Sequence, residues 1–238
     1  MITKKPYLIS EIIKETPEVS IFKFRAQDGS KLSYDPGMFV MIYYKNQETG
    51  EEIGRAFSLA SKPDEDTLEF AISMIHGRFT SKLDTAKVGD VYYVSGPHGQ
   101  FKYDPNQNKK VLFVAGGTGV APFLSMLRLI AEKKLDTDIK LLYSMRFSTE
   151  TIRKDELEGY KTSLKFEMTR SVTREQNVPG WDGEYGHIDA AMISRHVSDP
   201  KERTCYVCGP LKFTKAIEAA LVELGVDKAN IKADVWGE

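Results

Sequence analysis

Cysteine is scarce in this chain, which has only Cys205 and Cys208 among its 238 residues. Their C-x-x-C spacing can mark a redox dithiol or half of a zinc site, but no second cysteine pair completes such a site. The pair lies in TCYVCGP, a sequence typical of a short buried strand. Residues three apart on a strand point to opposite faces and lie about 10 Å apart, whereas a disulfide needs Cα atoms within about 7 Å. We therefore expect two free thiols.

Long apolar runs and a strong net charge are also missing. No apolar run approaches the roughly 18–20 residues that a membrane span needs, and the N-terminal MITKKPYLISEIIKE lacks the apolar core of a signal peptide. The net charge of −1 gives no reason to expect binding to nucleic acid or to an anionic membrane. The four histidines share no metal-binding spacing with other ligands, so we expect no metal. A cytoplasmic protein is the expectation.

The chain length suits two domains of about 100–130 residues each. Residues 1–104 contain six short β-rich runs separated by turn clusters, which predicts an antiparallel β-barrel or a sandwich. Residues 76–90 interrupt this pattern and predict a short helix with Thr80 or Ser81 near its N-cap. We take the barrel as the prediction for the N-terminal domain.

After a polar linker at 103–110, strands alternate with helices. This alternation predicts an α/β domain at 105–238, built on a parallel sheet with helices on both faces. Ligands bind such sheets at the carboxyl ends of the strands. The expected strands are 111–115, 138–145, 163–170, 205–209 and 230–234, and the expected helices are 121–134, 151–160, 187–197 and 212–225.

A glycine turn stands at the start of this second domain. The apolar run VLFVA at 111–115 reads as a strand buried on both faces, and GGTG at 116–119 leads into a helical pattern with Pro122 in its first turn. A strand, a glycine turn and a helix present backbone N–H groups and a positive helix end to a phosphate. The turn is neither the dinucleotide fingerprint nor a P-loop. A purely structural tight turn remains the alternative.

Five motifs, in order, resemble those of the ferredoxin–NADP reductase superfamily. They are RAFS at 55–58, GRFTSKL at 77–83, GPHGQF at 96–101, GGTGVAP at 116–122 and YVCGP at 206–210. The resemblance covers essentially the whole chain, and it implies a flavin-binding β-barrel followed by a nicotinamide-nucleotide domain. The chain lacks a cysteine-rich segment for an iron–sulfur cluster, so the resemblance is to members without a fused cluster domain.

The resemblance implies that the first domain binds FAD. Arg55 would pair with the flavin pyrophosphate, Phe57 would offer its flat face to the isoalloxazine ring, and Ser58 would lie near flavin N5. The alternatives are a surface salt bridge, a core aromatic and a turn hydroxyl. The remaining residues assigned to FAD are Ala56, Gly77, Phe79, Thr80 and Ser81.

The resemblance also implies that the second domain binds NAD(P)H. Gly117, Thr118 and Gly119 would hold the nucleotide, and Cys208 would lie beside nicotinamide C4 with Gly209 and Pro210. Ser144, Arg146 and Arg170 would favour NADPH over NADH, because no acidic residue closes the strand at 138–146. Cys208 could instead be a buried apolar cysteine. Trp236 is expected either to cover the flavin ring or to pack at the sheet edge.

The implied activity is transfer of hydride from NAD(P)H to FAD, with Ser58 and Cys208 as catalytic residues. Electrons would then pass to a separate acceptor, for which ferredoxin is the candidate. A reductase of free flavin is one alternative, and a flavin-binding module with a silent nicotinamide site is another.

Overall fold

A computed structural model describes residues 3–236. The chain forms two compact units. The first contains the residues up to Lys102 together with Ala121–Leu129, and the second contains Tyr103–Val120 together with the residues from Ile130 onward. The expected domain bounds, 1–104 and 105–238, stay a prediction.

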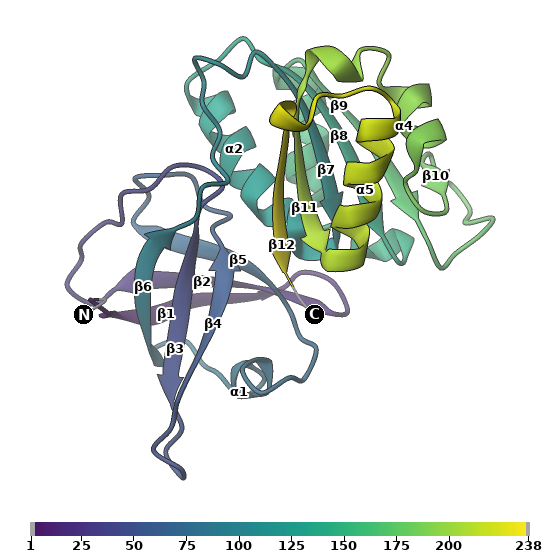
Figure 1. The fold of residues 1–238 in the computed structure, drawn as a ribbon. Coiled ribbons are helices and arrows are strands. Elements are labelled where there is room, and N and C mark those ends of the chain that lie inside the picture. Colours follow the sequence, from purple (N-terminus) through teal and green to yellow (C-terminus); the bar gives the residue numbers. More distant parts are fainter. Residues whose placement is uncertain (1–2, 237–238) are drawn as a thin grey trace. The chain divides into compact units, whose positions relative to one another are not determined.

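The first unit is an antiparallel sheet that curls into a barrel (Figure 1). Its strands follow the order β4-β3-β6-β1-β2-β5, and the two edge strands β4 and β5 also contact each other. The predicted antiparallel barrel is confirmed. Its elements are β1 (Lys5–Lys14), β2 (Val19–Ala26), β3 (Phe39–Lys45), β4 (Glu52–Ser58), β5 (Thr67–Ser73), α1 (Thr80–Leu83) and β6 (Val91–His98).

Aromatic rings fill the interior of this barrel. Along β3, Val40 and Ile42 are fully buried while their neighbours are more exposed, as expected for a strand with one face on a core. Phe24 meets Phe70 edge-to-face, with 5.6 Å between ring centroids, and it meets Tyr92 in the same way at 5.7 Å. Each such ring contributes about 1.5–3 kcal/mol when it is removed from water.

The predicted short helix is present, and Thr80 and Ser81 lie next to its N-cap as predicted. Helix α1 begins at Thr80, its N-cap is Phe79, and no side chain caps it. The Thr80 hydroxyl instead accepts a hydrogen bond from the backbone N–H of Gly77 at 2.9 Å. Thr80 therefore fixes the turn that leads into the helix, and not the first N–H groups of the helix itself.

The second unit is a parallel sheet in the order β10-β9-β8-β7-β11-β12, flanked by helices. The predicted α/β architecture is confirmed. Its elements are β7 (Lys110–Gly116), the 3₁₀-helix η1 (Gly117–Val120), α2 (Ala121–Glu132, of which residues 121–129 belong to the first unit), β8 (Asp138–Met145), η2 (Ser148–Glu150), α3 (Lys154–Ser163), β9 (Phe166–Val172), β10 (Glu184–Tyr185), α4 (Ala190–His196), η3 (Pro200–Glu202), β11 (Thr204–Pro210), α5 (Leu211–Glu223), η4 (Lys228–Asn230) and β12 (Ile231–Trp236).

The core of the second unit lies on both sides of β7. Every residue from Val111 to Gly116 is buried, because β7 pairs with β8 on one side and β11 on the other. Helices α4 and α5 cover one face of the sheet through Ile193, Ile217 and Leu221 (Figure 1). The prediction of a doubly buried strand is confirmed.

Two elements of this unit depart from the predicted bounds. Strand β9 begins at Phe166 and ends at Val172, beyond the predicted end at Arg170, because its last two residues pair with the short strand β10. Helix α3 begins at Lys154, three residues after the predicted start, because Arg153 takes a left-handed conformation with φ of +53°. The sequence did not predict β10 or the 3₁₀-helix η1.

Buried Arg203 ties the amino ends of three strands together. Its Nε donates to Asp199 Oδ1 at 2.6 Å, and its Nη1 donates to Asp138 Oδ1 at 2.7 Å and to the carbonyl of Val111 at 3.3 Å. Burial alone would raise the pKa of Asp199, but hydrogen bonds from Arg203 and Lys110 lower it overall. The pKa of the Asp199 carboxyl is therefore lower in the folded state than its value of about 3.9 in the unfolded chain. The ion pair of Asp199 with Arg203 stabilises the fold at a pH above about 3.9, and this contribution is lost as the pH falls through the lower pKa of the folded state.

Arg203→Met should lower the free energy of unfolding by about 3 kcal/mol, because it removes the buried guanidinium that pairs with Asp138 and leaves Asp199 with Lys110 alone. Tryptophan fluorescence during urea unfolding at neutral pH measures this loss, since both tryptophans belong to the second unit. Arg195→Met is the matched control, because the exposed guanidinium of Arg195 pairs with Glu184 and should contribute less than about 1 kcal/mol. Equal losses in the two variants would contradict the anchoring role of Arg203.

Candidate functional site

A pocket of about 340 Å³ in the first unit brings two of the sequence motifs together. Arg55 of the RAFS motif lies on β4, and Arg78 and Phe79 of the GRFTSKL motif precede α1, yet all three line this pocket. Glu51 and Glu52 line it as well, but Glu51 is engaged by Arg78 and Glu52 by Lys4. Within residues 3–236 no such partner is recorded for the side chain of Arg55.

This donor set fits a pyrophosphate. A half-buried guanidinium without a protein carboxylate can donate two parallel hydrogen bonds to phosphate oxygens. Arg78 was not among the predicted site residues. Its position inside the GRFTSKL motif was the signal that could have identified it.

Next to this pocket, Phe57 packs into an aromatic cluster. Its ring centroid lies 5.4 Å from that of Phe79 and 6.3 Å from that of Phe70, and the side chain is half-buried. Ser58 at the end of β4 is half-buried, and Ala56 is exposed. The aromatic contacts hold one side of the Phe57 ring in place, which suits a ring that stacks on a ligand with its other side.

The segment that leads into α1 and its first two helical residues have buried and exposed members. Phe79 and Thr80 are buried, Gly77 is half-buried, and Ser81 is exposed. A Cβ on Gly77 would meet no atom closer than 3.8 Å. This position therefore does not need glycine for packing within the described residues.

In the second unit, the glycines of the turn at 116–119 have different surroundings. A Cβ on Gly119 would lie 2.2 Å from the carbonyl oxygen of Cys208, so glycine is required there by protein packing. Gly117 has a φ of +55°, and a Cβ on it would meet nothing within 4 Å. Gly117 therefore borders open space, where a nucleotide phosphate can approach the backbone, and the next residue, Thr118, is half-buried.

Cys208 at the end of β11 is fully buried. Its Sγ lies 3.9 Å from Asp234 Oδ2 on β12, and burial followed by the nearby carboxylate raises the pKa of the thiol well above its usual value. Cys205 is buried as well, neither cysteine is in a disulfide, and the expected free thiols are confirmed. Gly209 is buried next to Cys208, and Pro210 is exposed.

Ser144 and Arg146 lie at the carboxyl end of β8, with Ser144 buried. Glu150 binds this strand end. Its Oε1 accepts from the Arg146 guanidinium at 3.1 Å, and its Oε2 accepts from the backbone N–H of Arg146 at 3.0 Å. The sequence prediction had placed no acidic residue at this strand end. The spacing of four residues between Arg146 and Glu150 was the missed signal.

Arg170 was predicted to bind the nucleotide at a strand end, but the structure buries it within β9. Its guanidinium donates to Asp182 at 2.5 Å and stacks on the Trp181 ring, with Cζ 4.7 Å from the ring centroid. The cation is therefore neutralised and covered by the loop between β9 and β10. The backbone of Trp236 ends β12 opposite Pro210. The two predictions for the Trp236 side chain lie outside the described part of the chain.

Comparisons with known proteins agree with this arrangement. Residues 6–103 match the oxidoreductase FAD-binding domain, and residues 113–219 match the oxidoreductase NAD-binding domain. A ferredoxin–NADP reductase B from Sorangium cellulosum is 29% identical, with 92% of each chain covered. A reductase component of terephthalate 1,2-dioxygenase from Comamonas sp is 26% identical over 92% of this chain and 64% of that protein. A ferredoxin NADP+ reductase from Neisseria gonorrhoeae with bound FAD and NADP has the same fold, with a TM-score of 0.83, 20% identity and 99% of each chain covered.

The chain thus contains an FAD-binding and an NAD-binding domain of the oxidoreductase type. It belongs to the ferredoxin–NADP reductase superfamily. The chain spans 59–64% of the length of the first three curated relatives.

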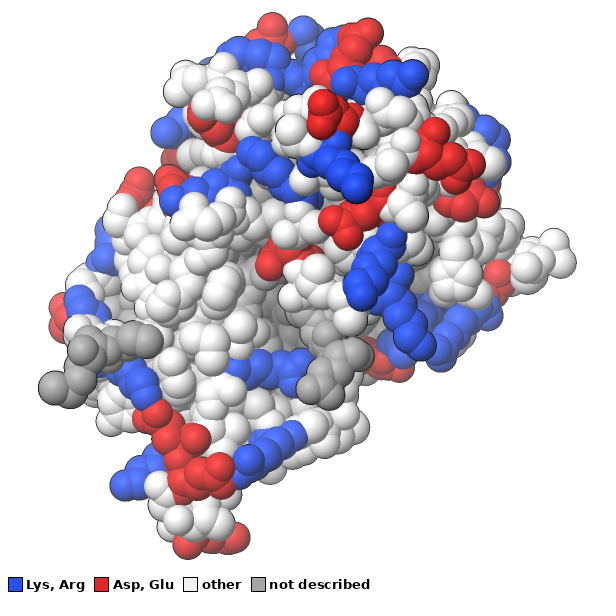
Figure 2. Space-filling model, viewed as in Figure 1, with Lys and Arg blue, Asp and Glu red and all other residues white. Residues whose placement is uncertain are grey.

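Three further observations concern the surface and the described residues as a whole. On the face shown in Figure 2, positive and negative side chains are interspersed, in keeping with the net charge of −1. Within residues 3–236, no helix is long and apolar enough to cross a bilayer. The same residues contain no group of three or more potential ligands that could hold a metal ion.

Arg55→Ala should weaken FAD binding by roughly 1.5–3 kcal/mol, the range for a hydrogen bond to a charged group, or about 10- to 150-fold in Kd. Quenching of flavin fluorescence during titration of the apoprotein measures this change. Arg25→Ala, at an exposed position on β2, is the matched control and should leave Kd unchanged. A colourless wild-type protein that does not take up FAD would contradict the assignment.

Proposed function

We propose that this chain is a flavoprotein oxidoreductase that passes hydride from NAD(P)H to FAD and then electrons to a separate acceptor. The observation that carries the proposal is the pocket that combines Arg55 with Arg78 and Phe79. Two motifs about 20 residues apart in sequence meet there, and they place the Arg55 guanidinium beside the aromatic ring of Phe79. Such a site suits a flavin dinucleotide better than a free phosphate.

The flavin supplies the redox chemistry when bound, since its ring accepts two electrons as hydride and can release them one at a time. The residues of the chain bind and orient it. Arg55 neutralises the pyrophosphate, the Phe57 ring supports the flat flavin, and the hydroxyl of Ser58 is the candidate hydrogen-bonding group near N5. Ala56, Gly77, Thr80 and Ser81 would complete the binding segments.

On the second unit, the proposed nucleotide-binding surface is the edge formed by Gly117 and Thr118. Gly119 contributes by allowing the turn to pack on β11, and Gly209 and Pro210 extend the same strand end. Cys208 is protonated at neutral pH because burial raises the pKa of its thiol. It would therefore act as a small neutral side chain next to the nicotinamide, and not as a thiolate nucleophile.

The proposed acceptor is ferredoxin or a similar one-electron carrier. The Sorangium relative, named a ferredoxin–NADP reductase, matches this chain over nearly all of both lengths. Other relatives are reductase components of oxygenases, which favours an electron-carrier partner in general. A reductase of free flavin would use the same two units but would release its flavin readily.

Anaerobic reduction of the purified, FAD-loaded protein tests this function. Mixing with NADH or NADPH should bleach the flavin absorbance, and subsequent addition of ferredoxin should restore it. Retention of FAD through gel filtration distinguishes this enzyme from a free-flavin reductase. A bound flavin that neither nucleotide reduces would instead indicate a flavin-binding module and would overturn the proposal.

Cys208→Ala should leave FAD bound but slow flavin reduction by NAD(P)H, because the nicotinamide would lose a packing contact at the strand end. Stopped-flow absorbance under anaerobic conditions gives the rate. Cys205→Ala is the matched control, since Cys205 is equally buried but belongs to the core beneath α4 and α5. Full-speed reduction in Cys208→Ala would refute the role.

Arg146→Ala should lower kcat/KM for NADPH more than for NADH if Arg146 binds the 2′-phosphate. The ion pair with Glu150 holds the guanidinium at the end of β8, where the phosphate would compete with a carboxylate. Steady-state kinetics with both nucleotides measures the ratio. An equal loss of kcat/KM for the two nucleotides would show that Arg146 only covers the adenosine and does not bind the 2′-phosphate.

A further inference from the structure

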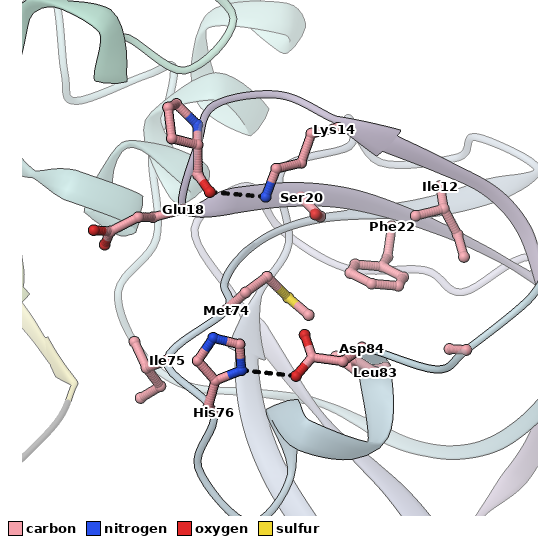
Figure 3. Close-up of a pocket in the computed structure, with 12 residues that line it drawn as sticks. Ile12, Lys14, Glu18, Ser20, Phe22, Met74, Ile75, His76, Leu83 and Asp84 are labelled. Carbon is pink, nitrogen blue, oxygen red and sulfur yellow. Dashed lines mark hydrogen bonds and ion pairs between the residues drawn. The ribbon is translucent and has the colours of Figure 1, made fainter.

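A second pocket in the first unit, of about 520 Å³, has no role in the function proposed above. The hairpin of β1 and β2 forms one wall, and the segment 74–76 together with the end of α1 forms the other (Figure 3). The volume lies within the usual range for small-molecule sites, about 300–1,000 Å³. The pocket is therefore large enough for a small organic ligand.

The hairpin wall carries a polar row of side chains next to an apolar row. Lys14 is the cross-strand partner of Ser20, and Ile12 is the cross-strand partner of Phe22. All four line the pocket, because residues two apart on a strand share a face of the sheet. The two rows lie about 7 Å apart along the strands. The wall therefore offers a polar end and an apolar end within the length of one small molecule.

The polar row has hydrogen-bonding capacity that the protein does not use. Ser20 is only 7% exposed, and none of the described residues hydrogen-bonds to its hydroxyl. Lys14 donates to the carbonyl of Pro17 at 2.8 Å, which uses one of its three ammonium hydrogens, and it forms no ion pair within residues 3–236. A buried hydroxyl that opens into a pocket beside an ammonium group is suited to bind a carboxylate.

The acidic side chains that line the pocket do not occupy the place beside Lys14. Asp84 Oδ2 is hydrogen-bonded to His76 Nδ1 at 2.8 Å, and this pair lies across Met74 from Lys14 (Figure 3). The carboxylate of Glu18 is turned away from the Lys14 ammonium group in the same view. The position beside Lys14 and Ser20 is therefore left to a ligand.

Apolar side chains form the floor between these polar groups, among them Phe22, Met74 and Leu83. Phe22 and Leu83 are buried, so their positions are fixed by the barrel core. The ring of Phe22 and the thioether of Met74 offer contact to an aromatic ring or to a short aliphatic chain. The floor therefore favours a ligand whose body is apolar.

We propose that the second pocket binds a small monocarboxylic acid with an apolar body. The body is an aromatic ring or a chain of about six carbons, which spans the roughly 7 Å between the two rows. Lys14 and Ser20 bind the carboxylate, and Phe22 and Met74 contact the body. This site goes beyond the proposed function, because it requires neither FAD at Arg55 nor a nicotinamide nucleotide.

Calorimetric titration of the FAD-loaded protein with benzoate, hexanoate, benzamide and acetate tests the proposal. Benzoate and hexanoate should bind. Benzamide should bind about fivefold more weakly than benzoate because it lacks the charge, and acetate should bind more weakly still because it lacks the apolar body.

Two variants test the polar row. Lys14→Met keeps the aliphatic stem and should weaken benzoate binding about fivefold while benzamide binding stays within about twofold. Ser20→Ala should weaken benzoate binding about threefold. Lys23→Met is the matched control, because Lys23 lies on the other face of β2, where it pairs with Glu11.

Absence of benzoate and hexanoate binding up to about 10 mM would overturn the proposal. Equal affinities for benzoate and benzamide, acetate binding as tight as benzoate binding, or unchanged benzoate affinity in Lys14→Met would overturn it too. Benzoate binding to the apoprotein that is lost on loading with FAD would show that the flavin fills the pocket and would also overturn it. None of these results bears on hydride transfer to FAD, which the anaerobic reduction tests separately.

Discussion

The close contact between the glycine turn and the end of β11 is the constraint on which the second unit depends. A side chain at Gly119 would lie 2.2 Å from the carbonyl oxygen of Cys208, so the turn can reach β11 only because that residue has no Cβ. Gly209 and Gly116 have a similar requirement, because the ring of Phe213 lies 2.6 and 3.0 Å from the positions of their missing Cβ atoms. These three glycines allow the turn, the strand and α5 to pack together.

This packing explains how one short segment combines a structural and a binding function. Gly119 is required by the fold, whereas at Gly117 the positive φ favours glycine and its missing Cβ borders open space. A structural turn and a phosphate-binding turn are thus compatible alternatives, because Gly119 serves the packing and Gly117 leaves room for a ligand. Because η1 follows the end of β7 and α2 starts directly after it, this turn lies at the carboxyl edge of the sheet, where ligands of parallel sheets bind.

The sequence allowed prediction of the architecture because its signals are local. The apolar run at 111–115 and the alternation along β3 each determine an element without reference to distant residues. It did not allow prediction of partners that meet through the fold. The ion pair of Arg170 with Asp182 depends on a loop whose only regular element is the two-residue strand β10. The burial of Cys208 depends on β12, which brings Asp234 beside it.

The same reasoning applies to the candidate site. The motifs identified Arg55 and the segment at 77–81, but their common pocket became visible only in the folded barrel. Arg78 and Glu150 were missed because a charged residue near a motif has no defined partner in the sequence. The structure gives each of them a partner of opposite charge: Arg78 pairs with the carboxylate of Glu51, and Glu150 pairs with the guanidinium of Arg146.

A crystal structure of the protein with FAD and an oxidised nicotinamide nucleotide would test the central claim most directly. The claim is that Arg55 holds the flavin pyrophosphate and that the turn at Gly117 and Thr118 holds the nucleotide. Flavin phosphate oxygens should lie within hydrogen-bond distance of the Arg55 guanidinium, and nucleotide phosphates should lie against the backbone of the turn. A flavin phosphate bound away from Arg55, or a nucleotide bound away from the turn, would contradict it.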